Sequence, residues 1–422
     1  MSERATRHAP NGMVCSVDHL ASEAGVAVLR GGGNAADAAV AASAVLAVTT
    51  PHLCGMGGDL FALVHDPATP GAPAALNASG RAGGGADLDR LRAEGHDVMP
   101  FHGDLRTAPV PGCVDGWLVL HERFGRLPLD DVLEAAVDYA NHGFPASPLL
   151  AAAVEEHDGV TGAEDLTGAS PLLPGDLVFR AGVGDTLTAV IEEGRAGFYE
   201  GAFGRGLLAI GGGEYEPGDL TTPLADWVEP LVVRAWDHDV WTIPPNSQGY
   251  LTLLGAAIAE GLALPDDPDD PGWAHLLVEA ARAAGHDRPA VLYEGADVWP
   301  LLHPDEIRRR RRLVDPERRN VTLGAGTAGG GTMHLCAGDA SGMAVSLIQS
   351  NASGFGCLVF EPTTRIGLHN RGIGFSVDPR HPAAYGPGRR PPHTLSPAMV
   401  TRPDGSVRAA IGTMGGDSQP QV

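Results

Sequence analysis

The segment from Ala325 to Ser350 constrains the fold more than any other part of the chain, and it reads AGTAGGGTMHLCAGDASGMAVSLIQS. A glycine-rich run ends at Gly331, and two short runs of alternating apolar and polar residues begin at Thr332. Asp, Ser and Gly separate these two runs, which is typical of the tight turn of a β-hairpin. We therefore predict that a flexible linker runs directly into the first strand of a hairpin.

The junction between the linker and the strand has the residue types that self-cleavage requires. The hydroxyl of Thr332 attacks the preceding carbonyl only if that peptide bond is bent and open, and Gly331 has no β-carbon in the way. Hydrolysis of the resulting ester makes Thr332 a new N-terminus. An α-amino group, with a reference pKa of about 7.7–8.0, then serves as general base for the hydroxyl. The alternative, from these residues alone, is an ordinary glycine-rich surface loop that leads into a strand.

Composition narrows the classes of function. The chain has 422 residues, of which 43% are hydrophobic, enough for a large core and, by length alone, for two or three domains. Its net charge of −23 argues against nucleic acid or an anionic membrane surface as a partner. All 29 basic residues are arginine, which excludes a P-loop lysine, a Schiff-base lysine and a lysine general base.

The sequence contains no recognisable targeting signal or cofactor motif. The first residues lack the apolar core of a secretory signal, and no apolar run is long enough to span a bilayer, so we expect a cytoplasmic protein. Histidines and acids show no paired metal-ligand spacing, and GGGNAADAA does not match the GxGxxG pattern of nucleotide binders. We expect no metal and no cofactor. The cysteines form no CxxC pair and are each expected to be small buried residues: Cys15, Cys54, Cys113, Cys336 and Cys357.

The first fifty residues predict a pair of helices. Apolar spacing predicts a helix from Leu20 to Leu29 that stops at Gly31, which is expected to take the left-handed conformation at the helix end. Asn34 is predicted to cap the next helix, which runs to about Val48 and is rich in alanine. Small side chains on this helix would let a neighbouring element approach closely.

Strand patterns surround further helical runs such as PLDDVLEAAVDYANHG and LTAVIEEG. Strands are predicted over residues 60–64, in AALNASG before Arg81, in DVWTI, in RIGLHNRG, and in TLSPAMVTRPDGSVRAAIG, which turns at residues 403–405. RRRRR at residues 308–312 is interpreted as an exposed helix face or turn, and LPDDPDDPGW as a solvated acidic loop, with a metal site as the alternative. Helices in front of a strand-rich tail predict an α+β body in which helices cover sheets.

Several longer motifs occur along the chain in this order: GMVCSVDHLASEAGVAVLRGGGNAADAAVAASAVLAVTTPHLCGMGGDLFALV, NASGRA, PGCVDGW, TMHLCAGDASGMAVS, GFG, LSPAMV and GTMGGDSQ. Together they closely resemble the γ-glutamyltransferase (γ-glutamyltranspeptidase) family of N-terminal nucleophile hydrolases, over residues 13–422. The resemblance implies a four-layered αββα sandwich and autocatalytic cleavage between Gly331 and Thr332. The large-subunit portion (residues 1–331) and the small-subunit portion (residues 332–422) are expected to remain interleaved in one composite domain.

The resemblance also implies roles for individual residues. Thr332 matches the nucleophile, and Gly415 and Gly416 match the paired glycines whose backbone N–H groups form the oxyanion hole. Ser350 matches a hydroxyl residue that helps to orient the nucleophile. Arg81 matches the arginine that pairs with the substrate's α-carboxylate, where a bidentate guanidinium suits a planar anion.

The chain departs from the family where γ-glutamyl-specific members hold the substrate's α-ammonium group with Asn, Gln and Asp. Arg371 stands in the Gln position and Gly374 in the Asp position, and Ala352 takes the Asn position, with Asn351 one residue early. An arginine about 4 Å from an ammonium group costs several kcal/mol at an effective dielectric constant near 20. We therefore predict a donor with a carboxylate but no α-ammonium, such as an oxamate-like or glutaryl-like amide, bound between Arg81 and Arg371. The alternative is that Arg371 points away and γ-glutamyl groups bind loosely.

Two neighbouring positions also differ from the family. His393 and Thr394 replace a serine pair that helps to hold the carboxylate, and both are predicted to bind substrate. His334 is in register with the motif of the second portion, and we expect it to be a hydrogen-bonded structural histidine.

These patterns predict a zymogen that becomes an amidohydrolase or acyltransferase of the γ-glutamyltransferase and glutathione hydrolase type, working through an acyl-Thr332 intermediate. Its partners would be a small-molecule amide and water or an amine acceptor, with hydrolysis favoured over transfer and a homodimer left open. Because Val422 follows soon after the oxyanion loop, we expect the second portion to be truncated. The alternative is an uncleaved, non-catalytic member of the fold that acts as a binding or scaffold protein.

Overall fold

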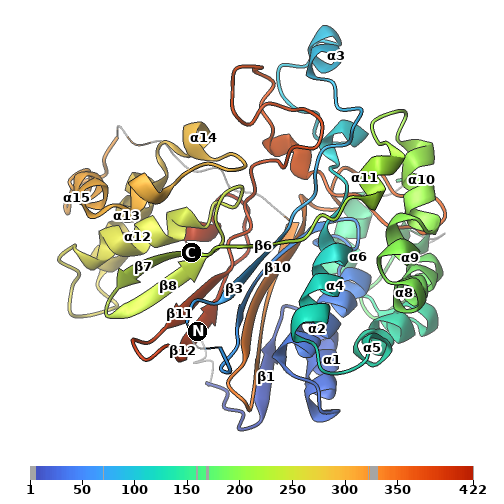
Figure 1. Ribbon diagram of the computed structural model, residues 1–422, viewed down its shortest axis with the longest axis horizontal. Coiled ribbons are helices and arrows are strands. Elements are labelled where there is room, and N and C mark those ends of the chain that lie inside the picture. Colours follow the sequence, from blue (N-terminus) through green and yellow to red (C-terminus); the bar gives the residue numbers. More distant parts are fainter. Residues whose placement is uncertain are drawn as a thin grey trace.

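Two β-sheets and the helices packed against them make up the computed structural model of this chain (Figure 1). The structure describes residues 6–69, 71–157, 160–167, 171–321, 323 and 331–421. The glycine-rich linker predicted ahead of Gly331 lies outside the described residues.

The larger sheet has six strands in the order β1-β9-β10-β2-β3-β6, the smaller has four in the order β12-β11-β8-β7, and β4 pairs with β5 alone. The strands are β1 (Gly12–Cys15), β2 (Asp59–His65), β3 (Ala74–Ala78), β4 (Phe144–Pro145), β5 (Leu177–Val178), β6 (Asp226–Val228), β7 (Leu231–Ala235), β8 (His238–Thr242), β9 (Gly331–Asp339), β10 (Ala344–Ala352), β11 (Ala398–Thr401) and β12 (Val407–Ile411). The predicted hairpin is therefore confirmed as β9 and β10. It lies between β1 and β2, so the larger sheet mixes strands from both sides of the predicted cleavage point.

The helices are concentrated in the part of the chain before Gly331. They are α1 (His19–Arg30), α2 (Ala35–Thr49), α3 (Leu88–Ala93), α4 (Cys113–Phe124), α5 (Leu129–His142), α6 (Pro148–Glu156), α7 (Glu164–Thr167), α8 (Ala181–Glu193), α9 (Arg195–Tyr199), α10 (Ala202–Ile210), α11 (Pro217–Thr221), α12 (Tyr250–Glu260), α13 (Pro271–Gly285), α14 (Arg288–Val291) and α15 (Pro304–Arg311), with 3₁₀ turns η1 (Leu105–Thr107), η2 (Trp299–Leu302), η3 (Arg371–Gly374) and η4 (Gln419–Gln421). A search of the described residues finds no helix with the length and apolar character needed to cross a membrane.

Alternate residues of β2 face two different layers. Leu60 and Val64 belong to the core that the larger sheet shares with α1, α2 and α4. Phe61 and Leu63 point the other way, into a core with residues of the smaller sheet such as Met399. Both faces of this strand are buried, which explains its almost wholly apolar sequence.

The smaller sheet carries helices on its other side. Helix α12 contacts β7 and β8, and α13 and α15 pack against α12. Leu231 and Val233 of β7 join Leu254 and Ile258 of α12 in a separate apolar core. The elements therefore follow one another as helices, larger sheet, smaller sheet and helices (Figure 1), and the predicted α+β class is confirmed.

The end of α1 differs from the prediction by one residue. Gly31 has a φ of −72°, and its N–H donates to Ala27 O at 2.8 Å, so it still closes the last helical turn. Gly32, with a φ of +98°, takes the left-handed conformation instead, because the chain reverses only after that turn is complete.

The start of α2 is confirmed in detail. The side chain of Asn34 accepts hydrogen bonds from Ala36 N and Asp37 N, and the Asp37 carboxylate accepts one from Asn34 N, which completes a capping box. Every residue of α2 is buried. The alanines therefore serve close packing of α1 and the larger sheet against this helix.

The strand predicted in RIGLHNRG does not form. Phe360 and Gly367 make a single bridge, and Arg371 begins η3. Ile366 is nevertheless buried in the main core. The apolar pattern here reflects burial of an irregular segment that leads to η3.

Cysteine burial also departs from the prediction at two positions. Cys15 is exposed and Cys336 is half-buried, whereas Cys54, Cys113 and Cys357 are buried. Cys15 lies on β1, an edge strand of the larger sheet, where one face of the strand is open to solvent.

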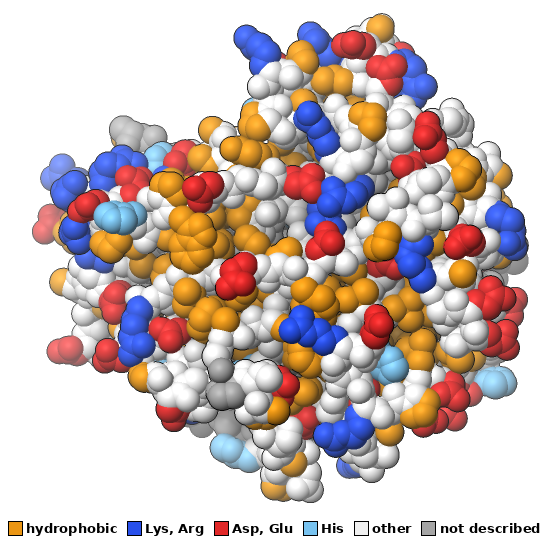
Figure 2. All heavy atoms as spheres, viewed as in Figure 1, with side chains coloured by type: hydrophobic (Ala, Val, Ile, Leu, Met, Phe, Trp, Pro, Cys, Tyr) orange, Lys and Arg blue, Asp and Glu red, His pale blue; other side chains and the backbone are white. Residues whose placement is uncertain are grey.

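The arginine run is only partly the exposed face that the sequence predicted. Arg308 and Arg309 are exposed and pair with acids one turn earlier in α15, and Figure 2 shows blue and red side chains interspersed at this left-hand end of the molecule. Arg310, in contrast, is fully buried. It binds Asp287 and Glu306 and donates to Ala284 O at 2.8 Å, so it satisfies carbonyls at the end of α13.

We expect Arg310→Ala to lower the free energy of unfolding by about 3 kcal/mol, because it leaves a half-buried acid and helix-end carbonyls without their donor. Arg308→Ala on the same helix should cost about 0.5 kcal/mol or less, since its ion pair is exposed. Urea unfolding followed by circular dichroism measures both variants. Equal losses would show that Arg310 adds no more than a surface arginine.

Candidate active site

Three adjacent strands align the first side chains of the site. Thr332 of β9 pairs with Ser350 of β10, and Ser350 pairs with Asp59 of β2. Residues paired directly across antiparallel strands project to the same face, and Ile348, on that face of β10, belongs to the core between the sheets. Thr332, Ser350 and Asp59 therefore form a row on the inter-sheet face, where β2 and β9 begin.

The hydroxyl of Ser350 joins Thr332 to the peptide bond that precedes it. Ser350 Oγ lies 3.1 Å from Thr332 Oγ1 and donates to Gly331 O at 2.5 Å, and it accepts from Ala352 N at 2.8 Å. A serine hydroxyl has one proton, and here that proton points to Gly331 O. Thr332 is therefore the donor to Ser350, and Thr332 itself is only 1% exposed.

Gly331 is packed so closely that only glycine fits. A β-carbon at this position would lie 2.8 Å from Ser353 O and 2.9 Å from Ser353 C. Both are backbone atoms that cannot move aside easily, so a side chain at Gly331 would displace the strand start that carries Thr332.

Gly415 and Gly416 lie in a tight loop after β12. Their φ angles are +132° and +58°, a region that favours glycine. Gln248 Nε2 fixes the loop by donating to Gly416 O at 3.0 Å and to Thr394 O at 2.9 Å. Within the described part of the chain no hydrogen bond joins either glycine to Thr332, so their role as oxyanion hole stays a prediction.

The segment before this loop packs against β9 near Thr332. A β-carbon on Gly412 would lie 2.4 Å from the His334 ring, and His334 is two residues from Thr332 on the same strand face. His334 Nε2 lies 3.0 Å from Ser346 Oγ, and burial lowers the pKa of His334 to about 4. This is the structural, hydrogen-bonded histidine that the sequence predicted.

A cavity of 430 Å³ lies between α14 and the segment that begins at η3. Its lining comprises Arg288, Pro289, Leu292, Arg371, Ile373, Gly374, Phe375, Ser376, His381, Ala383, Pro392, Thr394 and Asp417. His381 Nε2 lies 3.0 Å from Pro289 O and so connects the two sides. Arg371 and Thr394, both predicted to bind substrate, are therefore brought to one cavity.

Arg371 is a buried cation whose polar atoms are not all satisfied. The residue is 5% exposed, and no hydrogen bond or ion pair with the described residues engages its guanidinium. Thr394 Oγ1 is likewise buried without a partner. Burial lowers the pKa of Arg371 to about 10, although the negative charges of Asp59 and Asp417 act to raise it. The guanidinium is therefore still charged at neutral pH. A buried cation and a buried hydroxyl donor in one cavity fit an anionic ligand group.

Arg81 does not line this cavity. Its Nη1 donates to Glu294 Oε1 at 2.7 Å and to Gly388 O at 2.9 Å, and Nη2 lies 3.9 Å from Asp226. The two-arginine clamp predicted from Arg81 and Arg371 is not assembled here, and a carboxylate contact for Arg81 stays a prediction.

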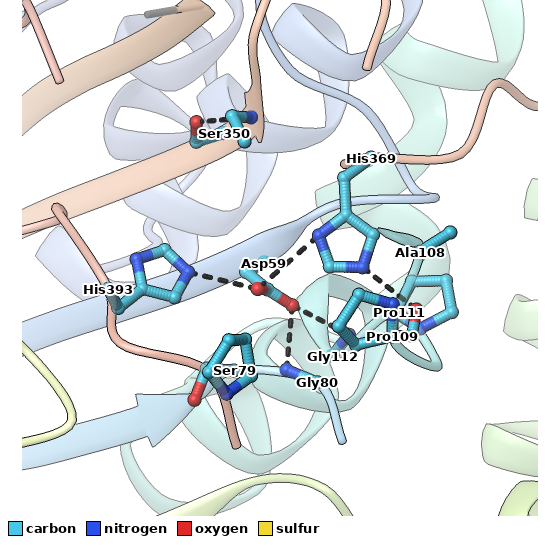
Figure 3. Close-up of polar contacts among 12 residues, drawn as sticks. Asp59, Ser79, Gly80, Ala108, Pro109, Pro111, Gly112, Ser350, His369 and His393 are labelled. Carbon is cyan, nitrogen blue, oxygen red and sulfur yellow. Dashed lines mark hydrogen bonds and ion pairs between the residues drawn. The ribbon is translucent and has the colours of Figure 1, made fainter. Parts of the chain in front are cut away.

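His393 and Thr394 face in different directions, which corrects their prediction as a substrate-binding pair. His393 is fully buried, and its Nε2 lies 2.9 Å from Asp59 Oδ2 (Figure 3). Burial, followed by the nearby charge of Arg371, lowers the pKa of His393 to about 3, so the ring is neutral. Only Thr394 lines the cavity.

Asp59 is the residue of the site that the sequence reading missed. The sequence signal for this residue is that it is a single acid at the start of the buried apolar run DLFALVH. Besides His393, the carboxylate contacts the His369 ring, at 3.4 Å, and accepts from Gly80 N at 2.7 Å (Figure 3). Among the described residues no group of three His, Cys, Asp or Glu side chains is arranged to hold a metal ion.

The chain is similar to known proteins along almost its whole length. The γ-glutamyltranspeptidase family model matches residues 21–422. The glutathione hydrolase-like YwrD proenzyme of Bacillus subtilis is 36% identical over 97% of this chain and 80% of its own length. The oxamate amidohydrolase proenzyme of Klebsiella pneumoniae is 34% identical over 98% of this chain and 80% of its own.

Solved structures give the same result for the fold. The cephalosporin acylase from Bacillus halodurans superposes with a TM-score of 0.90 at 32% identity, covering 100% of this chain and 80% of its own. The chain belongs to the γ-glutamyltranspeptidase family.

Proposed function

We propose that this chain is a self-processing amidohydrolase that cleaves carboxylate-bearing amides through an acyl-Thr332 intermediate. The observation that carries the proposal is the Ser350 hydroxyl, placed between Thr332 Oγ1 and the Gly331 carbonyl. The relatives are named as proenzymes of hydrolases and amidohydrolases, which supports an amidohydrolase of this family over an uncleaved scaffold. In this proposal the helix and sheet layers form the αββα sandwich of N-terminal nucleophile hydrolases.

Self-cleavage follows the hydrogen bonds of the precursor. Thr332 Oγ1 bonds to the Gly331 carbonyl carbon while its proton passes to Ser350, whose own proton moves to the carbonyl oxygen. Collapse breaks the C–N bond, the proton goes to nitrogen, and an ester joins Gly331 to the Thr332 oxygen. Water then hydrolyses the ester to a Gly331 carboxylate and a Thr332 with a free amino group.

The same oxygen serves in turnover. The free α-amino group of Thr332 removes the hydroxyl proton as Oγ1 attacks the substrate amide, and it returns a proton to the leaving amine. The N–H groups of Gly415 and Gly416 would stabilise the oxyanion, at about 3 kcal/mol per donor. Water completes the cycle by hydrolysing the acyl-Thr332 ester.

Arg371 is proposed to bind a carboxylate of the acyl donor, with Thr394 Oγ1 as a second donor. Two observations support this: the guanidinium is buried with no partner among the described side chains, and Asp417, the acid in the cavity lining, already pairs with Arg288 at 2.8 Å. A substrate ammonium next to Arg371 would be repelled. We therefore favour a donor without an α-ammonium group, and oxamate, the substrate in a relative's name, is such a molecule.

Ser350→Ala should slow self-cleavage about 100-fold, because it removes the hydrogen bond that polarises the Gly331 carbonyl, and Thr332→Ala should abolish it. Precursors made in a cell-free system are followed by denaturing gel, and mass spectrometry identifies the fragment that begins at Thr332. Ser346→Ala is the matched control, since this hydroxyl lies on the same strand face but bonds to Ile411 O. Processing of Ser350→Ala at the wild-type rate would contradict the proposed route.

Glutaryl-p-nitroanilide should be hydrolysed about 10-fold faster than γ-glutamyl-p-nitroanilide by the cleaved protein, because only the second places an ammonium near Arg371. Arg371→Met keeps the bulk of the side chain but removes its charge, so it should erase this preference. The comparison is of kcat/KM for the two anilides at pH 7.5. A wild-type preference for the γ-glutamyl compound would rule out this substrate class.

A further inference from the structure

We propose that Asp59 is a positioning residue that holds the Thr394 segment of the carboxylate site in place and supplies the buried counter-charge of Arg371. The inference rests on the proposed function, because it deepens the account of the same cavity. Asp59 touches neither the cavity nor Thr332, and it acts through the residues that it binds.

The Asp59 carboxylate uses both of its oxygens within the protein. Oδ1 accepts from Gly80 N at 2.7 Å and lies 3.4 Å from Gly112 N. Oδ2 lies 2.9 Å from His393 Nε2 and 3.4 Å from His369 Nδ1 (Figure 3). These contacts surround a carboxylate that is wholly buried.

The His393 bond is directional. Leu395 N donates to His393 Nδ1 at 3.3 Å, so in the neutral ring the proton is on Nε2 and points to Asp59. His393 immediately precedes Thr394, which lines the cavity. Asp59 therefore fixes the ring that anchors this side of the carboxylate site.

His369 lies beside Asp59 on the other side of the site. Its Nε2 donates to Pro109 O at 2.8 Å and its backbone N donates to Gly57 O at 2.9 Å, so these carbonyls fix the residue, with Nδ1 3.4 Å from Asp59 and without a hydrogen bond. Arg371 follows two residues later and opens η3. One carboxylate thus contacts the residues next to both Thr394 and Arg371.

Charge balance gives Asp59 its second role. The charged groups that act on Arg371 are Asp59, Asp417 and Arg288, and the charge of Arg371 in turn disfavours protonation of His369 and His393. Asp417 is paired with Arg288, and among the described residues Asp59 has only imidazoles and backbone N–H groups as partners. The Asp59 charge is therefore the one that offsets burial of the Arg371 guanidinium.

Burying an ionised acid at the start of an apolar strand costs free energy unless other groups stabilise its charge. Burial raises the pKa of Asp59, but the His369 and His393 rings and Gly80 N outweigh it and hold the value at about 2. The carboxylate is therefore ionised throughout the range in which the enzyme would work.

The test is Asp59→Asn in the full-length, self-cleaved protein, assayed with glutaryl-p-nitroanilide and with valeryl-p-nitroanilide, which has no carboxylate. We expect KM for the glutaryl compound to rise about 10-fold or more, and kcat/KM for the valeryl compound to change less than about 2-fold. Cleavage at Thr332 should proceed as in the wild type.

The pH profile separates the effect of the Asp59 charge from the effect of its hydrogen bonds. Arg371 has a lowered pKa of about 10, so the cation and glutaryl binding are present below that pH and are lost as pH rises through it. Without the Asp59 charge this pKa falls further. The alkaline limb of kcat/KM for the glutaryl compound should therefore shift down by about one pH unit in Asp59→Asn, equivalent to a tenfold change in proton affinity.

Asp115→Asn is the matched control, because it alters a buried carboxylate that binds Leu224 N and Arg195 on the helical side. It should leave the kinetic constants for both anilides and the alkaline limb of the pH profile unchanged. If Asp59→Asn does not fold, His393→Gln is the deciding variant. It removes the imidazole that Asp59 binds, so KM for the glutaryl compound should rise about 10-fold. It keeps the Asp59 charge, so the alkaline limb of the pH profile should stay where it is in the wild type.

Three outcomes overturn the inference: equal losses for both anilides, an unchanged glutaryl KM and limb in a folded, cleaved Asp59→Asn, or an unchanged glutaryl KM in His393→Gln. A wild-type protein that neither cleaves itself nor hydrolyses any anilide would instead refute the proposed function.

Discussion

The pairing of β9 with β10 and of β10 with β2 is the constraint on which the site depends. A slip of one residue would turn Thr332, Ser350 and Asp59 into the helix-facing core. The alternation of β10, which buries Leu347 toward the helices and Ile348 toward the smaller sheet, fixes the register. The chemistry of the site is thus set by packing on both faces of one sheet.

The regular pairing ends at the proposed point of cleavage. A bulge between Ser350 and Ala352 shifts the register where Gly331 pairs with Ala352, and Ala352 has a φ of +74°. Its N–H then bonds to Ser350 Oγ at 2.8 Å. The bulge therefore converts a backbone donor into a group that orients the serine hydroxyl.

Asp59 and Arg371 carry opposite charges and are buried near each other, yet they differ in the groups that they can still bind. Both oxygens of Asp59 already accept hydrogen bonds from the protein, so this acid has little left to offer a substrate ammonium. Arg371 makes no hydrogen bond or ion pair with the described residues, and its Nε is buried without a partner. The presence of an acid near the cavity is therefore compatible with a preference for anions.

Local signals in the sequence were sufficient where structure depends on neighbours in the chain. The hairpin at Thr332 and the cap at Asn34 were predicted because turn and capping residues act over a few positions. Arg310 and Asp59 were not assigned correctly, because their partners lie in other elements: the end of α13 and Asp287 for the arginine, and two imidazoles more than 300 residues away for the acid. The strand expected in RIGLHNRG failed for a related reason, since burial of Ile366 comes from tertiary packing.

The direction of one hydrogen bond connects the precursor to the proposed enzyme. In the precursor Ser350 donates to Gly331 O and accepts from Thr332, which draws the proton from the attacking hydroxyl toward the carbonyl oxygen. Under the proposed function, hydrolysis separates Gly331 from Thr332 and removes this acceptor. The Ser350 proton is then free to point to Thr332 Oγ1, while the new α-amino group takes over as the base. A single serine can therefore serve proton transfer before cleavage and orientation of the nucleophile afterwards, without any change in the strand register.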